Sequence, residues 1–165
     1  MKLKVTAFWL VVLAALFIFL QEYSKFHFFF IEQSQLFQFT GEYISEKLAM
    51  PGGFALTLSE FLVQFFIYPY AGAGITAGLL LLTGLGMRGI VRRIAPDTNC
   101  FLLYLIPIVL IMFLHFDFNY LVFGTIAFNM MLCVLYFCLC ISTDKWRMIA
   151  EIIITPLLYG LAGSV

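Results

Sequence analysis

Long apolar stretches fill nearly all of this 165-residue chain, and each is about as long as a membrane is thick. A helix rises about 1.5 Å per residue, so about 20 apolar residues cross the hydrocarbon core of a bilayer. Backbone amides in hydrocarbon must bond within their own segment or in a closed barrel. A barrel would show alternating stretches of about ten residues, whereas these runs are continuous. The sequence therefore predicts an all-α, polytopic transmembrane helix bundle with about five crossings.

Composition supports this class. Apolar residues make up 64% of the chain and charged residues 11%, and the mean hydropathy is +1.05. A soluble domain carries about a quarter charged residues, because water must wet its surface. The formal net charge is zero, so no basic face for nucleic acid is expected.

The pattern divides residues 1–165 into the parts of one transmembrane domain. These parts are crossings at 5–20, 100–114, 120–141 and 148–165, a polar loop at 21–53, and a short apolar helix plus a crossing at 54–87. The first crossing reads as an uncleaved signal anchor, since no small-x-small cleavage site follows it. The apolar C-terminal end favours the N-terminal part of a longer membrane protein.

Basic residues fall on one side of this alternation. Seven of the nine share a side, namely Lys2, Lys4, Arg88, Arg92, Arg93, Lys145 and Arg147. Cytoplasmic loops of membrane proteins carry an excess of Lys and Arg. The pattern predicts a bacterial inner-membrane protein with a cytoplasmic N-terminus and a periplasmic polar loop, provided that 54–87 crosses an odd number of times.

The polar loop and the segment after it have their own features. Apolar residues recur at helical spacing from Glu32 to Leu48, which predicts an amphipathic helix on the membrane surface. The run Phe54–Pro69 is short and ends at a proline, so it is either a re-entrant helix or half of a broken crossing. Gly74 and Gly78 form a G-x-x-x-G step that predicts close helix packing.

Two carboxylates are the candidate catalytic residues. Glu60 lies in an apolar run on one helical stripe with Thr57 and Gln64. An acid at membrane depth is costly, so it faces protein or a wet cavity, unless the helix only touches lipid headgroups. Glu32 either stabilises a helix start or points into a pocket.

The tight turn His115-x-Asp117-x-Asn119 lies on the same outer side. These side chains are suited to a metal or a sugar, although Asp and Asn in short turns more often bond backbone amides. A full ligand set is lacking, so no metal site is predicted, and the cofactor stays unknown. With Gln64, the three residues are candidate substrate-binding groups.

Two pairs are expected within the later helices. Asn129, one turn after Thr125, predicts a hydrogen bond between helices. Arg147 and Glu151 are four residues apart, which predicts an ion pair at a helix end.

The stretch Glu32–Phe37, the break Pro51-Gly52-Gly53 and the run Phe61–Pro69 resemble the N-terminal region of a family of large, multi-pass bacterial inner-membrane proteins of unknown function. The resemblance covers most of the chain, including the turn His115–Asn119. Members of that family are longer than this chain.

A second resemblance is architectural. Glycosyltransferases of the C fold use polyprenyl-phosphate sugars and have one crossing followed by a long periplasmic loop with an acidic catalytic residue. Glu32 matches that residue best and Glu60 next. The usual acidic pair is absent, because Gln33 follows Glu32, and basic residues for the lipid phosphate are scarce. The resemblance implies an envelope glycosyltransferase-like enzyme with Glu32 or Glu60 as general base.

Two other functions remain open. A non-catalytic scaffold or complex subunit would use the Gly74/Gly78 face and the Phe-rich surface helix to bind other membrane subunits. A transporter would place its substrate beside a helix broken at Pro69. The expected partners are the lipid bilayer, a polyprenyl-phosphate-linked sugar and other membrane subunits.

Overall fold

The structure is a computed structural model that describes residues 2–96, 101–117 and 119–163. Every regular element in these ranges is a helix. The helices are α1 (Lys2–Tyr23), α2 (Lys25–Ser34), α3 (Gly41–Leu48), α4 (Gly53–Val63), the short 3-10 helix η1 (Gln64–Ile67), α5 (Ala71–Ile94), α6 (Phe101–Leu114), α7 (Val122–Cys140) and α8 (Asp144–Ala162). The prediction of an all-α fold is confirmed.

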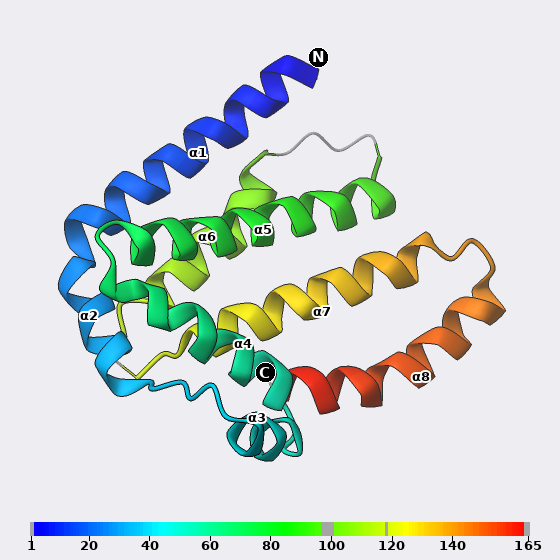
Figure 1. Ribbon diagram of the computed structural model, residues 1–165. Helices are drawn as coiled ribbons and strands as arrows, with labels where there is room; N and C mark the ends of the chain where they lie inside the picture. Colours follow the sequence, from blue (N-terminus) through cyan, green and yellow to red (C-terminus); the bar gives the residue numbers. More distant parts are fainter. Residues whose placement is uncertain (1, 97–100, 118, 164–165) are drawn as a thin grey trace.

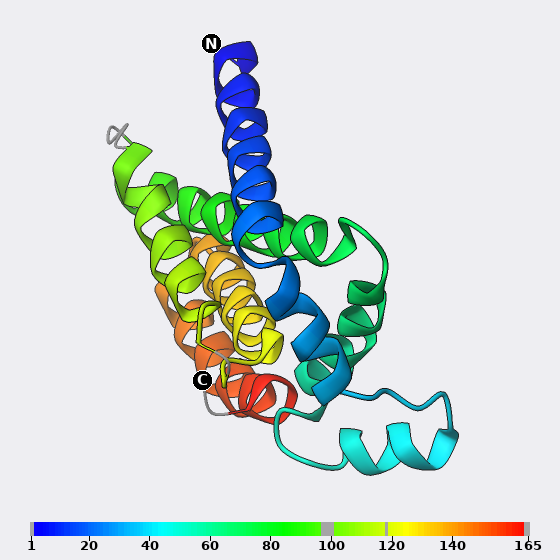
Figure 2. The ribbon, with the colours of Figure 1, turned by 90° about the vertical axis from the view of Figure 1, so that its left-hand side faces the viewer.

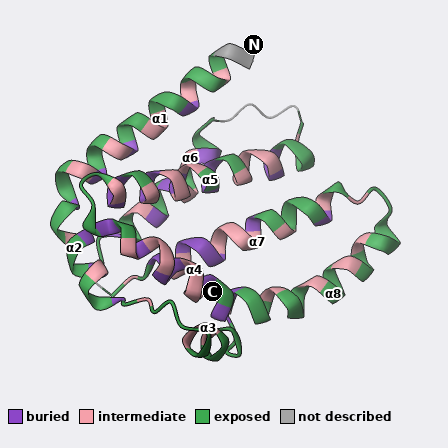
Figure 3. Cartoon of the chain, viewed as in Figure 1, coloured by how far each residue is buried: buried purple, intermediate pink, exposed green. Residues whose placement is uncertain are grey.

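Helices α1, α5, α6, α7 and α8 form an up-and-down bundle in which successive helices run in opposite directions (Figure 1). The centre of the bundle is the pair α5 and α7. Helix α5 packs against α1, α6 and α7, and α7 also contacts α4 and α8. Buried residues gather on α4, α5 and α7, whereas α1 and α8 are mostly exposed (Figure 3).

Three helices are long and apolar enough to cross a membrane, at Lys4–Tyr23, Ala71–Ile94 and Val122–Cys140. They correspond to three of the predicted crossings, and they support a membrane protein. The number is smaller than the five or so that the sequence predicts, because α6 is a shorter helix of 14 residues and α8 carries four charged residues within its 19. The predicted crossing ends at Cys100 and Val165 lie outside the described residues.

Basic residues gather at one end of the bundle, which we call the basic end. Helices α1 and α8 begin there with Lys4, Lys145 and Arg147, and α5 ends there with Arg92 and Arg93. The opposite end, which we call the loop end, carries α2, α3 and α4 (Figure 2). Lys25 and Lys47 are in α2 and α3, so the two predicted groups of basic residues lie at opposite ends of the bundle.

Helix α4 lies across the loop end and does not run through the bundle. At its start, the Gly52 N–H donates to the carbonyl of Gly160 in the last turns of α8, at 2.9 Å. At its end it continues into η1, which packs against α2 and α5. Tyr70 then takes a left-handed conformation, with φ 69°, and the chain reverses into α5. Helices α4 and α5 are therefore separate helices joined by a reversal of the chain.

The predicted surface helix from Glu32 to Leu48 is wrong in its extent. Helix α2 ends at Ser34, residues 35–40 have no regular structure, and α3 covers only the second half of the predicted range. The hydroxyl of Thr40 caps α3 by accepting a hydrogen bond from the Tyr43 N–H at 3.3 Å. Between the two helices, the rings of Phe37 and Phe39 pack on Phe61 of α4, at 5.8 and 6.2 Å between centroids, so these apolar residues make a tertiary contact and do not lie in a helix.

A polar contact joins the two central helices. The Asn129 amide donates to the Leu79 carbonyl of α5 at 3.3 Å and to the Thr125 carbonyl of its own helix at 2.9 Å. Thr83 donates to the Asn129 amide oxygen at 3.2 Å. The predicted hydrogen bond between helices is confirmed.

Side chains of neighbouring helices pack tightly on α5 at Gly84, and not at the predicted Gly74/Gly78 step. A methyl group on Gly84 would lie 2.5 Å from Ile108 of α6 and 2.8 Å from the Trp9 ring of α1. At Gly78 it would meet nothing within 4 Å, and at Gly74 only a Phe17 ring atom at 3.9 Å. The expectation of close packing at Gly74 and Gly78 is therefore wrong for contacts within this chain.

Candidate functional site

The carboxylate of Glu60 lies at the loop end and holds two donors from α3. The Lys47 ammonium donates to Oε1 at 2.8 Å, and the Tyr43 hydroxyl donates to Oε2 at 2.6 Å. The Lys47 ammonium also lies 5.3 Å from the centre of the Tyr43 ring. The Glu60 side chain is 9% exposed and that of Lys47 24%, so the ion pair is largely shielded from water. Such charge-assisted hydrogen bonds are stronger than neutral ones.

These contacts fix the protonation of both donors. The hydrogen bond from Lys47 to Glu60 raises the pKa of the Lys47 ammonium above its ordinary value. Burial, together with the hydrogen bond to Glu60, raises the pKa of Tyr43. Both groups therefore keep their protons at neutral pH and remain donors to the carboxylate.

The turn Pro51-Gly52-Gly53 brings the two helices into this arrangement. Gly52 has φ +80°, a left-handed conformation that favours glycine. A methyl group on Gly53 would lie 1.9 Å from the carbonyl oxygen of Lys47, so only glycine allows the end of α3 to approach α4 this closely. Tyr43 and Lys47 are four residues apart and share one face of α3, which this turn directs at Glu60.

The pair borders a pocket of about 630 Å³, which we call the Glu60 pocket. Its lining comes from α2, α3, α4 and the segments that flank them, together with the stretch before α7. The lining residues are Phe30, Ser34, Gln35, Leu36, Tyr43, Lys47, Leu56, Glu60, Asn119 and Leu121. The pocket therefore combines one ion pair with neutral polar groups at the loop end of the bundle.

Gln35 contributes an amide whose hydrogen-bonding capacity is unused within the described chain. Neither its oxygen nor its nitrogen has a hydrogen-bond partner, and both atoms are buried. Leaving a buried polar group unpaired costs about 1–3 kcal/mol. A rotation of this side chain into the pocket that it already lines would let the amide bind a polar ligand.

The other residues of the predicted α4 stripe have structural contacts. Gln64 donates its amide to the Phe37 carbonyl at 3.1 Å and so ties down the segment before α3. Thr57 donates to the Gly53 carbonyl of its own helix at 2.6 Å. Glu32 lies in the last turn of α2, so the expected helix-start position is wrong, and it does not line the Glu60 pocket.

The turn His115–Asn119 is divided between the core and the pocket. His115 is 2% exposed, and its Nε2 lies 2.9 Å from the Thr125 hydroxyl. Asp117 accepts a hydrogen bond from the backbone N–H of Asn119 at 2.9 Å, the backbone bond that such turns commonly contain. Only Asn119 reaches the Glu60 pocket. Among the described residues, no three His, Cys, Asp or Glu side chains lie close enough to hold a metal ion.

Burial has a strong effect on this histidine. It lowers the pKa of His115 to about 4, with a further contribution from nearby His27. The imidazole is therefore neutral at pH 7 and acts as a core residue.

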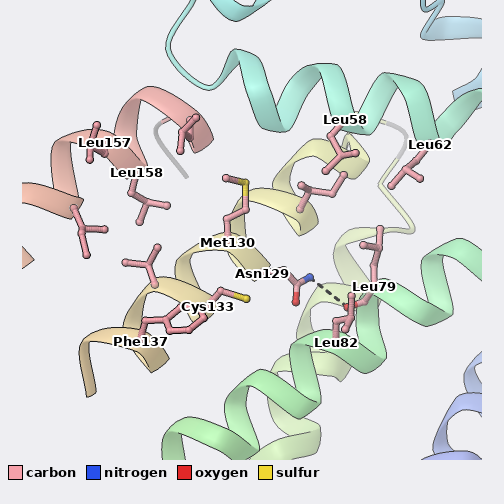
Figure 4. A pocket seen from close by; sticks show the side chains of 14 residues that line it. Leu58, Leu62, Leu79, Leu82, Asn129, Met130, Cys133, Phe137, Leu157 and Leu158 are labelled. Carbon is pink, nitrogen blue, oxygen red and sulfur yellow. Dashed lines mark hydrogen bonds between the residues drawn. The ribbon is translucent and has the colours of Figure 1, made fainter. Parts of the chain in front are cut away.

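A second hollow, of about 490 Å³, lies between α4, α5, α7 and α8 (Figure 4). Leucine side chains from α4, α5 and α8 point into it, and Met130 and Phe137 of α7 form its floor. Its one amide, Asn129, is hydrogen-bonded to the Leu79 carbonyl. This hollow is suited to apolar groups such as acyl chains, and its lining contains no carboxylate, imidazole or ammonium group, the Cys133 thiol being its one ionisable side chain.

Sequence reasoning did not identify Tyr43, Lys47 or Gln35 as site residues. Tyr43 falls at the apolar spacing of the segment Glu32–Leu48, and Lys47 is one of the two basic residues outside the seven that share a side, so neither pattern indicates a site. The spacing of Tyr43 and Lys47 is the available signal, because it places a hydroxyl and an ammonium on one helix face. That this face of α3 meets Glu60 of α4 depends on the turn at Gly53, which the spacing does not reveal.

Comparison with known proteins places the chain in a family. Searches of curated proteins and of solved structures return no match. One family model, described as a family of unknown function (DUF6057), matches residues 1–165. The match covers the whole length of the chain, and this chain therefore belongs to the DUF6057 family.

Proposed function

We propose that this chain is a five-crossing inner-membrane domain whose Glu60 pocket binds the sugar of a lipid-linked donor at the periplasmic face. The five crossings would be α1, α5, α6, α7 and α8, which alternate in direction between the two ends of the bundle. The basic end would be cytoplasmic by the positive-inside rule. The loop end, with α2, α3 and α4, would then face the periplasm.

The observation that carries this proposal is a buried carboxylate, held by two donors, in the wall of a polar pocket at that end. The charges of Glu60 and Lys47 compensate each other, so the pocket favours a neutral, hydroxyl-rich group over a phosphate. The Gln35 amide and Asn119 supply further hydrogen-bonding groups. A lipid phosphate would need a cation outside the pocket, and Lys25 of α2 is at the same end of the bundle.

In the proposed reaction, Glu60 is the general base. It accepts the proton of an acceptor hydroxyl while that oxygen forms a bond to the anomeric carbon of the donor sugar. The bond from the anomeric carbon to the phosphate breaks, and its electron pair leaves with the polyprenyl phosphate. Lys47 and Tyr43 would act as positioning residues that fix the carboxylate. Glu32 has no part in this assignment, because it does not line the pocket.

The test compares two variants, Glu60→Gln and Glu32→Gln, in the full-length protein. Native mass spectrometry of the detergent-extracted protein is expected to show a bound polyprenyl-phosphate species in wild type and in Glu32→Gln. This species should be lost in Glu60→Gln, together with any sugar transfer, while hydrogen exchange in α5 stays as in wild type and so shows that the bundle remains folded. Bulk phospholipid alone in the wild type, or unchanged binding and transfer in Glu60→Gln, would rule the proposal out.

A scaffold is the second candidate, and it is favoured by the free surface above Gly74 and Gly78. Among the described residues this G-x-x-x-G step has no neighbour closer than a Phe17 ring atom, which leaves room for the close approach of another membrane helix. This function predicts that Gly74→Leu dissociates a complex in native membranes while Glu60→Gln has no effect. The opposite pattern would favour the enzyme.

A further inference from the structure

Helix α8 is the least covered of the long helices, and its open face contains a polar notch. Its main packing partners among the described helices are α7 and α4, and its one buried residue is Ala162. Its exposed large apolar side chains are Trp146, Met148, Ile149, Ile152, Ile153, Leu157, Tyr159 and Leu161. A hollow of about 450 Å³ interrupts this surface at Met148, Glu151, Ile152, Thr155 and Pro156.

The notch presents hydrogen-bond acceptors. Glu151 is exposed, and no ion pair to it is formed within the described chain. The expected Arg147–Glu151 pair is wrong, because Arg147 binds Asp144 in the first turn at 2.6 Å, where the helix dipole also favours the acid. The hydrogen of the Thr155 hydroxyl is used by the Glu151 carbonyl at 2.7 Å. Pro156 has no amide hydrogen, so the helix supplies no i+4 donor to the Ile152 carbonyl.

The position of the notch along α8 makes these unpaired acceptors significant. Glu151 lies one helical turn, about 6 Å, farther from the basic end than Arg147. If α8 crosses the membrane as proposed above, Glu151 is inside the bilayer and faces outward. Acidic residues in crossing helices are costly and almost always pair with another group. None of the described residues of this chain supplies such a group, so a crossing α8 leaves this carboxylate to be paired by a group beyond them.

We propose that the α8 notch docks a membrane helix of another polypeptide that carries one Arg or Lys a turn inside its cytoplasmic end. A guanidinium has five donors and no acceptor, which complements a carboxylate beside an unpaired carbonyl. A second copy of this chain is a poorer occupant, because symmetric α8–α8 packing would place two Glu151 carboxylates together. The inference rests on the proposed crossing of α8.

The test uses a synthetic poly-Leu/Ala transmembrane peptide with a single Arg one turn from its end, and a matched peptide with Leu at that position. The full chain is labelled and reconstituted with each peptide in phosphatidylcholine vesicles, and association is followed by energy transfer. The Arg peptide is expected to bind about tenfold tighter than the Leu peptide. Glu151→Gln should remove this difference, and Glu46→Gln, on exposed α3, should keep it. Equal binding of the two peptides, or a preference that survives Glu151→Gln, overturns the proposal.

Two further outcomes separate this inference from the proposed topology. Thr155→Cys should resist a membrane-impermeant maleimide while Ser142→Cys reacts. Labelling of Thr155→Cys would refute the crossing of α8 and this inference with it. Protection of that cysteine without any preference for the Arg peptide would refute the docking alone. Self-association of the chain that Glu151→Gln abolishes would make a second copy the occupant and overturn the assigned partner.

Discussion

The ion pair between Lys47 and Glu60 should control whether α3 stays attached to the bundle. Helix α3 has no buried residue of its own, and two hydrogen bonds to Glu60 connect it to α4. At 2.8 Å the gross attraction of the pair is about 6 kcal/mol at an effective dielectric constant of about 20, and desolvation offsets most of it. A hydrogen bond to a charged group contributes about 1.5–3 kcal/mol net. Because Lys47 is 24% exposed, we take about 2 kcal/mol for Lys47→Met.

This loss converts to about a thirtyfold increase in local opening of α3. Hydrogen exchange of the backbone amides of α3 and α5, followed by mass spectrometry in detergent, measures it directly. Exchange in α3 should accelerate about thirtyfold while exchange in α5 stays unchanged. Glu46→Gln is the matched control, because Glu46 is exposed on the same helix and should change stability by less than about 0.5 kcal/mol.

A double-mutant cycle completes the test. In the background of Glu60→Gln, the additional effect of Lys47→Met should fall well below its effect in the wild-type chain, because the charge it pairs with is gone. Equal effects in both backgrounds, or α3 exchange in Lys47→Met that matches Glu46→Gln, would refute the assignment of the ion pair as the attachment of α3.

Three other predictions follow from the geometry. Gly53→Ala should loosen α3 as Lys47→Met does and cost about 2 kcal/mol, because the new methyl group would overlap the Lys47 carbonyl oxygen at 1.9 Å. Hydrogen exchange of the α3 amides should accelerate in this variant, and unchanged exchange would contradict the prediction. Burial lowers the pKa of His115 from 6.5 to about 4, so the stability that the neutral imidazole contributes should be complete above pH 6.5. It should fall by about 3 kcal/mol as the pH drops to 4, since the unfolded chain binds the proton more readily than the folded one. The melting temperature should depend less steeply on pH in His115→Gln, and an equal dependence would exclude this histidine as the source of the pH effect. Gly84→Leu should cost about 1–3 kcal/mol through overlap with α1 and α6, while Gly78→Leu should be close to neutral in the same unfolding assay, and a reversed order would show that the helices pack on the other face.

The sequence alone determined the class of the protein and the approximate positions of its long helices. Hydropathy is a local and additive property, so a run such as Val5–Leu20 indicates a crossing whatever it packs against. The structure extends that run to Lys2–Tyr23 and keeps the basic residues of α1 and α8, with Arg92 and Arg93 of α5, at one end of the bundle. Pro69 likewise marks a helix boundary, because its ring removes a donor from any continuing helix.

Tertiary structure decided which polar residues meet. The sequence offers both Glu32 and Glu60 as candidate acids, and only Glu60 receives Lys47 and Tyr43. That contact joins residues 13 and 17 positions apart in the chain. It requires the chain to reverse at Gly52-Gly53 and α3 to begin at the Thr40 cap, and neither event is visible in the spacing of apolar residues.

The structure also decided two details that spacing left open, the ion-pair partner of Arg147 in α8 and the tightly packed glycine of α5. Arg147 had Asp144 and Glu151 as acids within reach on one helix, and side-chain geometry selected Asp144. Gly74 and Gly78 have the spacing of a packing motif, yet the neighbouring helices approach at Gly84. Periodicity specifies which residues share a face, whereas the neighbour of that face is fixed by the packing of the whole bundle. This is why the sequence predicted the helices and singled out Glu60, but not the residues that meet it.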